Sequence, residues 1–160
     1  MEDHNKKELT LTRIFDAPRE LVFKAWTDPK LLAKWWGPNG FTNPVCEADA
    51  RPDGSIHIVM VAGEELGDLN GISFPMTGTF KEIDSPNRIV FTTQPLRDGK
   101  PILDNLNTVT FEEYGDKTRM TLHVVVMKAT PEAAGPLSGM EIGWSQSLDK
   151  LAALPLFTNK

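Results

Sequence analysis

Few side chains in this sequence are of the types that perform acid–base or nucleophilic chemistry. The chain has three histidines, His4, His57 and His123. A general base must lie within hydrogen-bond reach of its substrate. The alternation of residue types around His57 and His123 places each imidazole opposite the apolar residues of a strand, so both are expected to face solvent. The histidines therefore give no sign of a catalytic centre.

The single cysteine and the acidic residues give no stronger signal. No signature places a base beside Cys46, so a small hydrophobic residue in a strand is the favoured interpretation, and a nucleophile is the alternative. Depending on register, four carboxylates would enter a pocket: Glu47, Asp49, Glu82 and Glu141. Solvated faces or ion pairs are the favoured interpretation, whereas an enclosed carboxylate would favour a general acid. No catalytic constellation is visible, which favours binding over catalysis.

Metal and cofactor motifs are missing from the sequence. There is no H-E-x-x-H, no C-x-x-C and no clustered spacing of His and Asp, so no metal site is expected. The run 63–71 is rich in glycine, but it lacks the lysine and the spacing of a phosphate-binding loop. We therefore expect no bound cofactor.

Length and charge restrict the class of protein. A chain of 160 residues predicts one domain, residues 1–160, with a frayed polar tail at residues 1–7. A net charge of −5 argues against a nucleic-acid partner. No apolar run is long enough to span a membrane, and no secretory signal is found. With a single cysteine, a cytoplasmic location is the expectation.

Strands predominate among the elements that would position these residues. The alternation of residue types predicts strands at 8–15, 45–50, 55–62, 74–83, 88–94, 107–113 and 117–127. Two short helices are expected after the first strand, one capped by Asp16 and one over 29–36 that starts at Asp28-Pro29. Residues 95–101 are expected to form a polar connection. Consecutive hairpins with segregated helices predict an α+β fold with an antiparallel sheet.

One long amphipathic helix is expected over 130–154, interrupted near Gly135-Pro136 and ended by Pro155. Its apolar stripe contains Leu137, Met140, Trp144, Leu148 and Leu151. A second row of small residues, Gly139, Gly143 and Ser147, forms a furrow that a backbone or a ligand would be able to approach closely. This helix is the candidate to cover the apolar face of the sheet.

Several stretches, in this order and spacing, resemble the activator-of-Hsp90-ATPase-like family of the START-related (SRPBCC) superfamily. They are FDAPRELVFKAWTDPKLLAKWWGP (15–38), RPDGSIHIVM (51–60), GTFKEIDSPNRIVFT (78–92), TVTFEE (108–113), TRMTLH (118–123) and GWSQSLDKLAAL (143–154). The resemblance implies the helix-grip fold: a curved antiparallel sheet of about six to seven strands, wrapped around a long C-terminal helix, with two short helices after the first strand. It also implies a pocket between sheet and helix.

The resemblance and the Met- and aromatic-rich apolar face together favour binding of a small hydrophobic or amphipathic molecule in this pocket. The expected ligand-binding residues are Trp35, Trp36, Ile58, Met60, Phe74, Met76, Phe80, Phe91, Met140, Gly143 and Trp144. For Trp35 and Trp36, core packing of both side chains is the favoured interpretation, and the alternative is that one packs under the sheet edge while the other rims the pocket mouth. Plain core packing with a collapsed cavity is the alternative for the other expected ligand-binding residues.

Relatives of this kind also include cyclases, hydrolases and a co-chaperone domain. An enzyme that uses pocket carboxylates, and an interaction module that regulates a chaperone ATPase, are therefore alternative functions. A homodimer is compatible with the superfamily. The acidic loop with Glu64, Glu65 and Asp68 is expected to be solvated, and in related folds such a loop acts as a lid, for which Gly63, Gly67 and Gly71 would be hinges.

Overall fold

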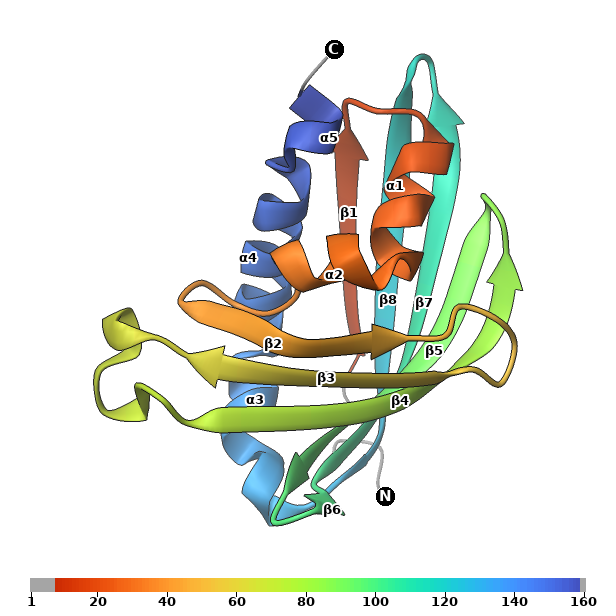
Figure 1. The fold of residues 1–160 in the computed structure, drawn as a ribbon. Coiled ribbons are helices and arrows are strands. Elements are labelled where there is room, and N and C mark those ends of the chain that lie inside the picture. The colour runs from red at the N-terminus through yellow and green to blue at the C-terminus, as the bar shows by residue number, and fades with distance from the viewer. Residues whose placement is uncertain (1–7, 159–160) are drawn as a thin grey trace.

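The computed structural model describes residues 8–158, so His4 and the predicted tail at residues 1–7 lie outside the described residues. The described chain forms a strongly curved antiparallel sheet that encloses helices on its inner side (Figure 1). In Figure 1 the strands β2, β3 and β4 cross in front of the C-terminal helices, whereas β1, β7 and β8 run roughly along them. The predicted α+β class and the sheet wrapped around C-terminal helices are confirmed.

All neighbouring strands of the sheet are antiparallel. The strands are β1 (Glu8–Phe15), β2 (Phe41–Ala48), β3 (Ser55–Ala62), β4 (Ser73–Asp84), β5 (Arg88–Arg97), β6 (Lys100–Pro101), β7 (Leu103–Tyr114) and β8 (Lys117–Ala129). Their order across the sheet is β1-β8-β7-β5-β4-β3-β2, and the short β6 pairs with β5. Chain-distant strands therefore become neighbours: Glu8 of β1 lies opposite Val125 of β8.

Several strand predictions were wrong at their boundaries: β7 begins at Leu103 and not at 107, and the bounds of β2, β4, β5 and β8 also differ from those predicted. β2 begins at Phe41 and ends at Ala48, whereas the sequence predicted 45–50. In the sequence, Pro44 argued against a strand that includes this position. The strand tolerates the proline because β2 is an edge strand and its register shifts between Thr42 and Val45. The predicted connection 95–101 is instead the end of β5, a turn, and β6.

Seven short helical segments accompany the strands in the described chain. They are α1 (Arg19–Thr27), α2 (Pro29–Trp35), η2 (Glu64–Leu69), η3 (Pro131–Ala133), α3 (Ala134–Ser138), α4 (Met140–Ala152) and α5 (Pro155–Thr158). Asp28 caps α2 as predicted, because its side chain accepts a hydrogen bond from the Lys30 N–H at 2.9 Å. The predicted cap position at Asp16 was wrong: the N-cap residue of α1 is Pro18, which makes no side-chain hydrogen bond.

The C-terminal helix is shorter and more segmented than predicted. Its interruption lies at Gly139, between α3 and α4, and Gly135-Pro136 lies inside α3. Pro136 is tolerated there because the first turn of a helix does not use its N–H groups. Pro155 starts α5, so it does more than end the preceding helix. The main segment, α4, has 13 residues and is roughly 20 Å long.

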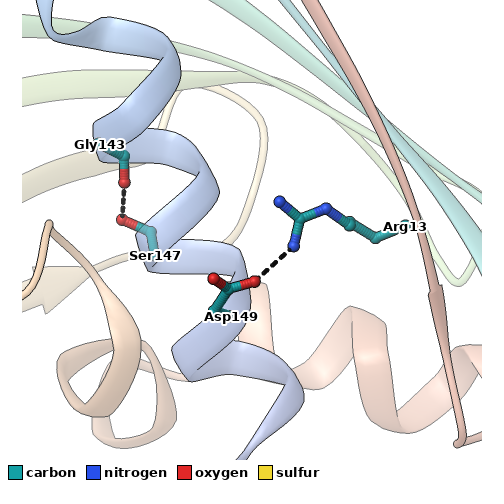
Figure 2. Close-up of polar contacts among 4 residues, drawn as sticks. All are labelled: Arg13, Gly143, Ser147 and Asp149. Atoms are coloured by element: carbon teal, nitrogen blue, oxygen red, sulfur yellow. Dashed lines mark hydrogen bonds and ion pairs between the residues drawn. The ribbon is translucent and has the colours of Figure 1, made fainter.

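Helix α4 packs its apolar stripe against the inside of the sheet. Leu148 and Leu151 are fully buried, as the predicted stripe requires, whereas Ile142 on the other side is 65% exposed. One ion pair fixes α4 to β1, with 2.8 Å between the Arg13 Nη1 and the Asp149 Oδ1 (Figure 2). Because the Asp149 side chain is 72% exposed, this pair contributes little to stability, and apolar packing holds the helix.

Candidate functional site

All four tryptophans of the chain gather between the sheet and the helices. We call Trp26, Trp35, Trp36 and Trp144 the tryptophan cluster. Trp26 of α1 lies edge-on to Trp35 of α2, with 4.6 Å between ring centroids, and stacks on Trp144 of α4 at 6.0 Å. Trp36 meets Trp144 edge-on at 5.3 Å. The cluster therefore joins three helices, and Phe91 of β5 attaches it to the sheet through contacts with Trp26 and Trp36.

A small apolar cavity lies beside this cluster. It is lined by Trp26, Leu32, Trp36, Ile56, Ile58, Phe80 and Phe91. Its volume is about 10 Å³, which is about the space of one water molecule. Pockets that enclose drug-sized ligands measure roughly 300–1,000 Å³. The predicted pocket is therefore closed in this structure, because the lining side chains leave almost no space between them.

A larger hollow of about 250 Å³ lies elsewhere, at the surface between α1, the β7–β8 turn and α5. It is lined by Asp16, Ala17, Pro18, Leu21, Asp116, Leu156 and Phe157. None of the residues predicted to bind a ligand lines this hollow. The aromatic region inside the sheet therefore stays the candidate site.

The structure divides the predicted binding residues into three groups. Trp36, Ile58, Phe80 and Phe91 line the cavity. Trp35, Met76, Met140 and Trp144 are core or cluster residues that do not line it. Met60, Phe74 and Gly143 lie apart from it: Phe74 packs against Phe41 at 5.6 Å, Met60 lies opposite Phe74 on the neighbouring strand, and Gly143 faces Pro38. The sequence missed Trp26, Leu32 and Ile56, although Trp26 lies on the apolar stripe of α1.

Trp35 and Trp36 differ in their surroundings. Trp35 is fully buried, and its indole Nε1–H donates a 2.9 Å hydrogen bond to the backbone carbonyl of Ala25. Trp36 is half-buried and reaches the surface beside Trp144. Trp26 is 3% exposed, yet its Nε1–H finds no acceptor among residues 8–158. The cluster therefore contains one satisfied and one unsatisfied buried indole donor.

The row of small residues on α4 does not open toward the cavity. A Cβ atom on Gly143 would lie 3.5 Å from the Cγ of Pro38, so Gly143 faces the loop that follows α2. Ser147 is buried and donates its hydroxyl to the Gly143 carbonyl at 2.9 Å (Figure 2). The furrow therefore serves contact between α4 and this loop, and the prediction that Gly143 lies in the pocket has no support from its geometry.

Two hydrogen bonds hold the loop after α2 against α4 beside Trp36. The Asn39 N–H donates to the Gln146 Oε1 at 3.0 Å, and the Lys150 Nζ donates to the Pro38 carbonyl at 3.2 Å. Partial burial lowers the pKa of Lys150, and nearby Glu65 opposes this shift. The acidic loop joins the same region because the Gly63 N–H donates to the Gly40 carbonyl at 2.8 Å.

The candidate acid–base groups face outward. His57 lies 3.5 Å from Glu47, and His123 lies 2.9 Å from Glu8, all on partly exposed side chains, which confirms the predicted orientation of both imidazoles. Asp49 and Glu82 form surface ion pairs with neighbouring arginines, and Glu141 is exposed. Within residues 8–158, no Asp, Glu or His is buried, and no three such groups or cysteines could hold a metal ion.

Cys46 is half-buried on the inner side of β2. Burial raises the pKa of its thiol to about 11, and the charge of Glu47 adds to this shift. Its thiolate is therefore scarce at neutral pH, which disfavours a nucleophilic role. The geometry supplies neither an acid–base pair nor an activated nucleophile within the described inner face of the sheet.

Three buried polar residues on the inner face of β5 and β7 had no counterpart in the sequence prediction. Thr93 is 5% exposed, Asn105 is 7% exposed and Asn107 is fully buried. The Asn107 Nδ2 donates to the Phe91 carbonyl at 3.2 Å and to the Thr93 hydroxyl at 3.1 Å. The predicted strand started at Asn107 and so left Asn105 out. However, both asparagines lie at alternate positions with Val109 and Phe111, and this spacing indicates that all four face the same side of the sheet.

Comparison with known proteins agrees with this architecture. The family profile described as "Activator of Hsp90 ATPase homolog 1-like protein" matches residues 16–155. No curated protein matches the sequence. In the described part of the chain, no helix has both the length and the apolar character that crossing a membrane requires.

Similar solved structures cover nearly the whole chain. A Chromobacterium violaceum protein is 31% identical, with 91% of this chain and 94% of that chain covered and a TM-score of 0.77. A Nitrosomonas europaea protein is 27% identical, with 96% of each chain covered and a TM-score of 0.74. The AHSA1 protein of Silicibacter pomeroyi is 27% identical, with 92% of this chain and 96% of that chain covered and a TM-score of 0.74.

Proposed function

Because the chain belongs to the activator of Hsp90 ATPase homolog 1-like family, we propose that it binds a small hydrophobic or amphipathic molecule between the sheet and α4. The wider superfamily often binds hydrophobic ligands. The ligand would lie against the tryptophan cluster, in an expanded form of the cavity beside it. Residues proposed to contact it are the cavity-lining side chains and Trp144.

The observation that carries the proposal is the composition of the cavity wall. Four aromatic and three aliphatic side chains from two helices and three strands converge on one point, Ile58 among them fully buried. Such a wall favours apolar molecules because their contact with it removes apolar surface from water. The enclosed volume is small, so the ligand must displace some of these side chains.

Trp36 and Trp144 are the side chains best placed to move. Both are half-buried, so the cluster has an outer end that is already in contact with water. Only two hydrogen bonds between described residues hold the loop at 37–40 to α4 there, one through Asn39 and one through Lys150. The break at Gly139 separates α4 from α3, so α4 is able to shift without moving the preceding segment.

The first experiment is native mass spectrometry of the protein purified from its own host, which would reveal a retained small molecule. Binding of a defined probe, 2-naphthol, is then measured by isothermal titration calorimetry. The variant Ile58→Phe fills the cavity and should abolish this binding. Leu122→Phe is the matched control, because Leu122 is equally buried on the inner face but does not line the cavity.

Overpacking a core position costs roughly 1–3 kcal/mol of stability, and this cost applies to both variants. Loss of binding in Ile58→Phe alone would therefore report on the cavity and not on stability. Unchanged affinity in Ile58→Phe would move the binding site elsewhere. No detectable 2-naphthol binding to the unmodified protein, together with a mass free of any retained molecule, would refute the proposed function.

A contact with a chaperone ATPase is the second candidate, because the family is described as similar to an activator of the Hsp90 ATPase. One observation favours a protein contact: Ile142 is 65% exposed on α4, on the side away from the core. A direct test measures whether the protein stimulates the ATPase of purified Hsp90 and whether Ile142→Ser removes this effect. An unchanged ATPase rate would eliminate this candidate.

A further inference from the structure

We propose that the molecule bound inside the sheet carries a neutral hydrogen-bond donor, such as a hydroxyl or an amide N–H, which binds the side-chain oxygen of Asn105 or of Asn107. This inference rests on the proposed function and adds a chemical class to it. The apolar body of the molecule would lie against the tryptophan cluster. Its donor would lie against β7.

The two asparagines occupy a place in the sheet where apolar residues are expected. The inner face of β7 consists of Leu103, Asn105, Asn107, Val109 and Phe111, all of them buried. Across the sheet, Asn107 lies opposite Phe91 on β5 and Val124 on β8. Directly opposite residues have Cβ atoms about 5 Å apart, so Asn107 adjoins a side chain that forms the cavity wall.

The oxygens of this pair are acceptors without a donor. Within residues 8–158, the Oδ1 atoms of Asn105 and Asn107 are both buried and accept no hydrogen bond. The orientation of the Asn107 amide is fixed, because its Nδ2 donates to two acceptors, the Phe91 carbonyl and the Thr93 hydroxyl. Turning the amide over would face its oxygen toward the Phe91 carbonyl. Its Oδ1 must therefore point to the remaining side.

A buried carbonyl oxygen without a donor is destabilising, and more than nine-tenths of buried polar groups in proteins have a partner. Two neighbouring exceptions on one strand, next to a residue of the cavity wall, indicate a site that is completed from outside the chain. The donor must be neutral. No carboxylate is buried among the described residues, so an ammonium group placed here would be a buried charge without a counter-ion.

Two matched probes test this inference by isothermal titration calorimetry. The donor 2-naphthol and its methyl ether, 2-methoxynaphthalene, share the same apolar body, but only 2-naphthol donates a hydrogen bond. The unmodified protein should bind 2-naphthol about tenfold more tightly than the ether, because a buried asparagine oxygen gains a partner only from 2-naphthol. This ratio should fall toward one in whichever of the variants Asn105→Leu and Asn107→Leu removes the acceptor of the naphthol hydroxyl.

Asn105→Leu is the primary variant, because Asn107→Leu also removes the bonds of Nδ2 and could impair folding. Thr118→Val is the matched control: Thr118 is a buried polar residue of the same inner face, but its hydroxyl already donates to the Ala17 carbonyl at 2.7 Å. Thr118→Val should lower the melting temperature and leave the probe ratio unchanged. Asn105→Leu should leave the melting temperature unchanged or raise it.

Each outcome bears on one of the two proposals. If both probes bind the unmodified protein with equal affinity, the asparagine oxygens are satisfied by water and this inference is wrong, while the proposed function stands. If the ratio persists in both asparagine variants, the hydroxyl of 2-naphthol donates to another acceptor and the inference is again wrong. If neither probe binds and the purified protein retains no small molecule, the proposed function itself fails.

Discussion

Substitution of Trp35 would test whether the hydrogen bond from its indole N–H to the Ala25 carbonyl stabilises the packing of α2 against α1. The carbonyl of Ala25 lies in the last turn of α1, and its partner in a continuous helix would be the N–H of residue 29. Residue 29 is Pro29, which has no N–H. The Trp35 Nε1–H supplies the missing donor at 2.9 Å, in a fully buried position.

The perturbation is Trp35→Phe, compared with Trp26→Phe. Both tryptophans are buried in the same cluster, and both substitutions remove the same part of an indole ring, which costs roughly 1–2 kcal/mol of unfolding free energy. Trp35→Phe additionally leaves the Ala25 carbonyl buried without a donor, which costs about 1–3 kcal/mol. Trp26→Phe adds no such term, because the Trp26 N–H has no acceptor in the described chain.

Urea unfolding followed by far-ultraviolet circular dichroism measures the difference. We expect Trp35→Phe to be less stable than Trp26→Phe by about 1–3 kcal/mol at an unchanged denaturant slope. For a domain of this size, each kcal/mol lowers the melting temperature by roughly 2–4 °C. Equal stability of the two variants, or a greater loss in Trp26→Phe, would refute the role assigned to the Trp35 hydrogen bond.

Four further outcomes are expected. Asp28→Ala removes the cap of α2 and should lower stability by about 1 kcal/mol in thermal melts, whereas Asp28→Asn should retain most of it. Cys46 should react with iodoacetamide at pH 8 roughly a hundredfold more slowly than a free thiol, because its pKa is raised from 9.0 to about 11, and a rate equal to that of a model peptide would contradict this. Gly78→Ala should prevent stable folding, since its Cβ would lie 2.0 Å from the Thr92 carbonyl oxygen. Gly135→Ala meets no atom within 4 Å and should stabilise α3 by up to about 1 kcal/mol, which melting curves of both variants would check.

The order of the elements was predictable because local patterns determine it. Strict alternation identified β1 and β3 with their observed bounds, and Asp28-Pro29 marked the start of α2. Boundaries failed where distant partners decide them. A proline in β2 is tolerated because one edge of that strand is unpaired, and the sequence around Pro44 carries no information about the sheet edge.

The site was predictable in its chemistry and not in its geometry. Aromatic residues of the inner face were identified, and Trp36 and Phe91 do line the cavity. Its volume depends on how side chains from five separate elements pack, at a precision that no local pattern contains. Asn105 and Asn107 illustrate the same limit. In the sequence, polar residues at the start of a strand resemble a loop, and only the three-dimensional structure shows that these two side chains are buried.

The pairing of β1 with β8 also bears on how this chain is made. Their paired residues are separated by more than a hundred positions along the sequence. At roughly 5–20 residues per second, a ribosome would need about 5–20 s between the synthesis of β1 and that of β8. During this interval β1 has no strand to pair with, because β8 is its only neighbour in the described sheet. Such non-local pairing slows folding and leaves hydrogen-bonding edges exposed. We infer that β1 is the first strand of the sheet to leave the ribosome and the last to be incorporated, so the nascent chain is most exposed to aggregation just before β8 emerges.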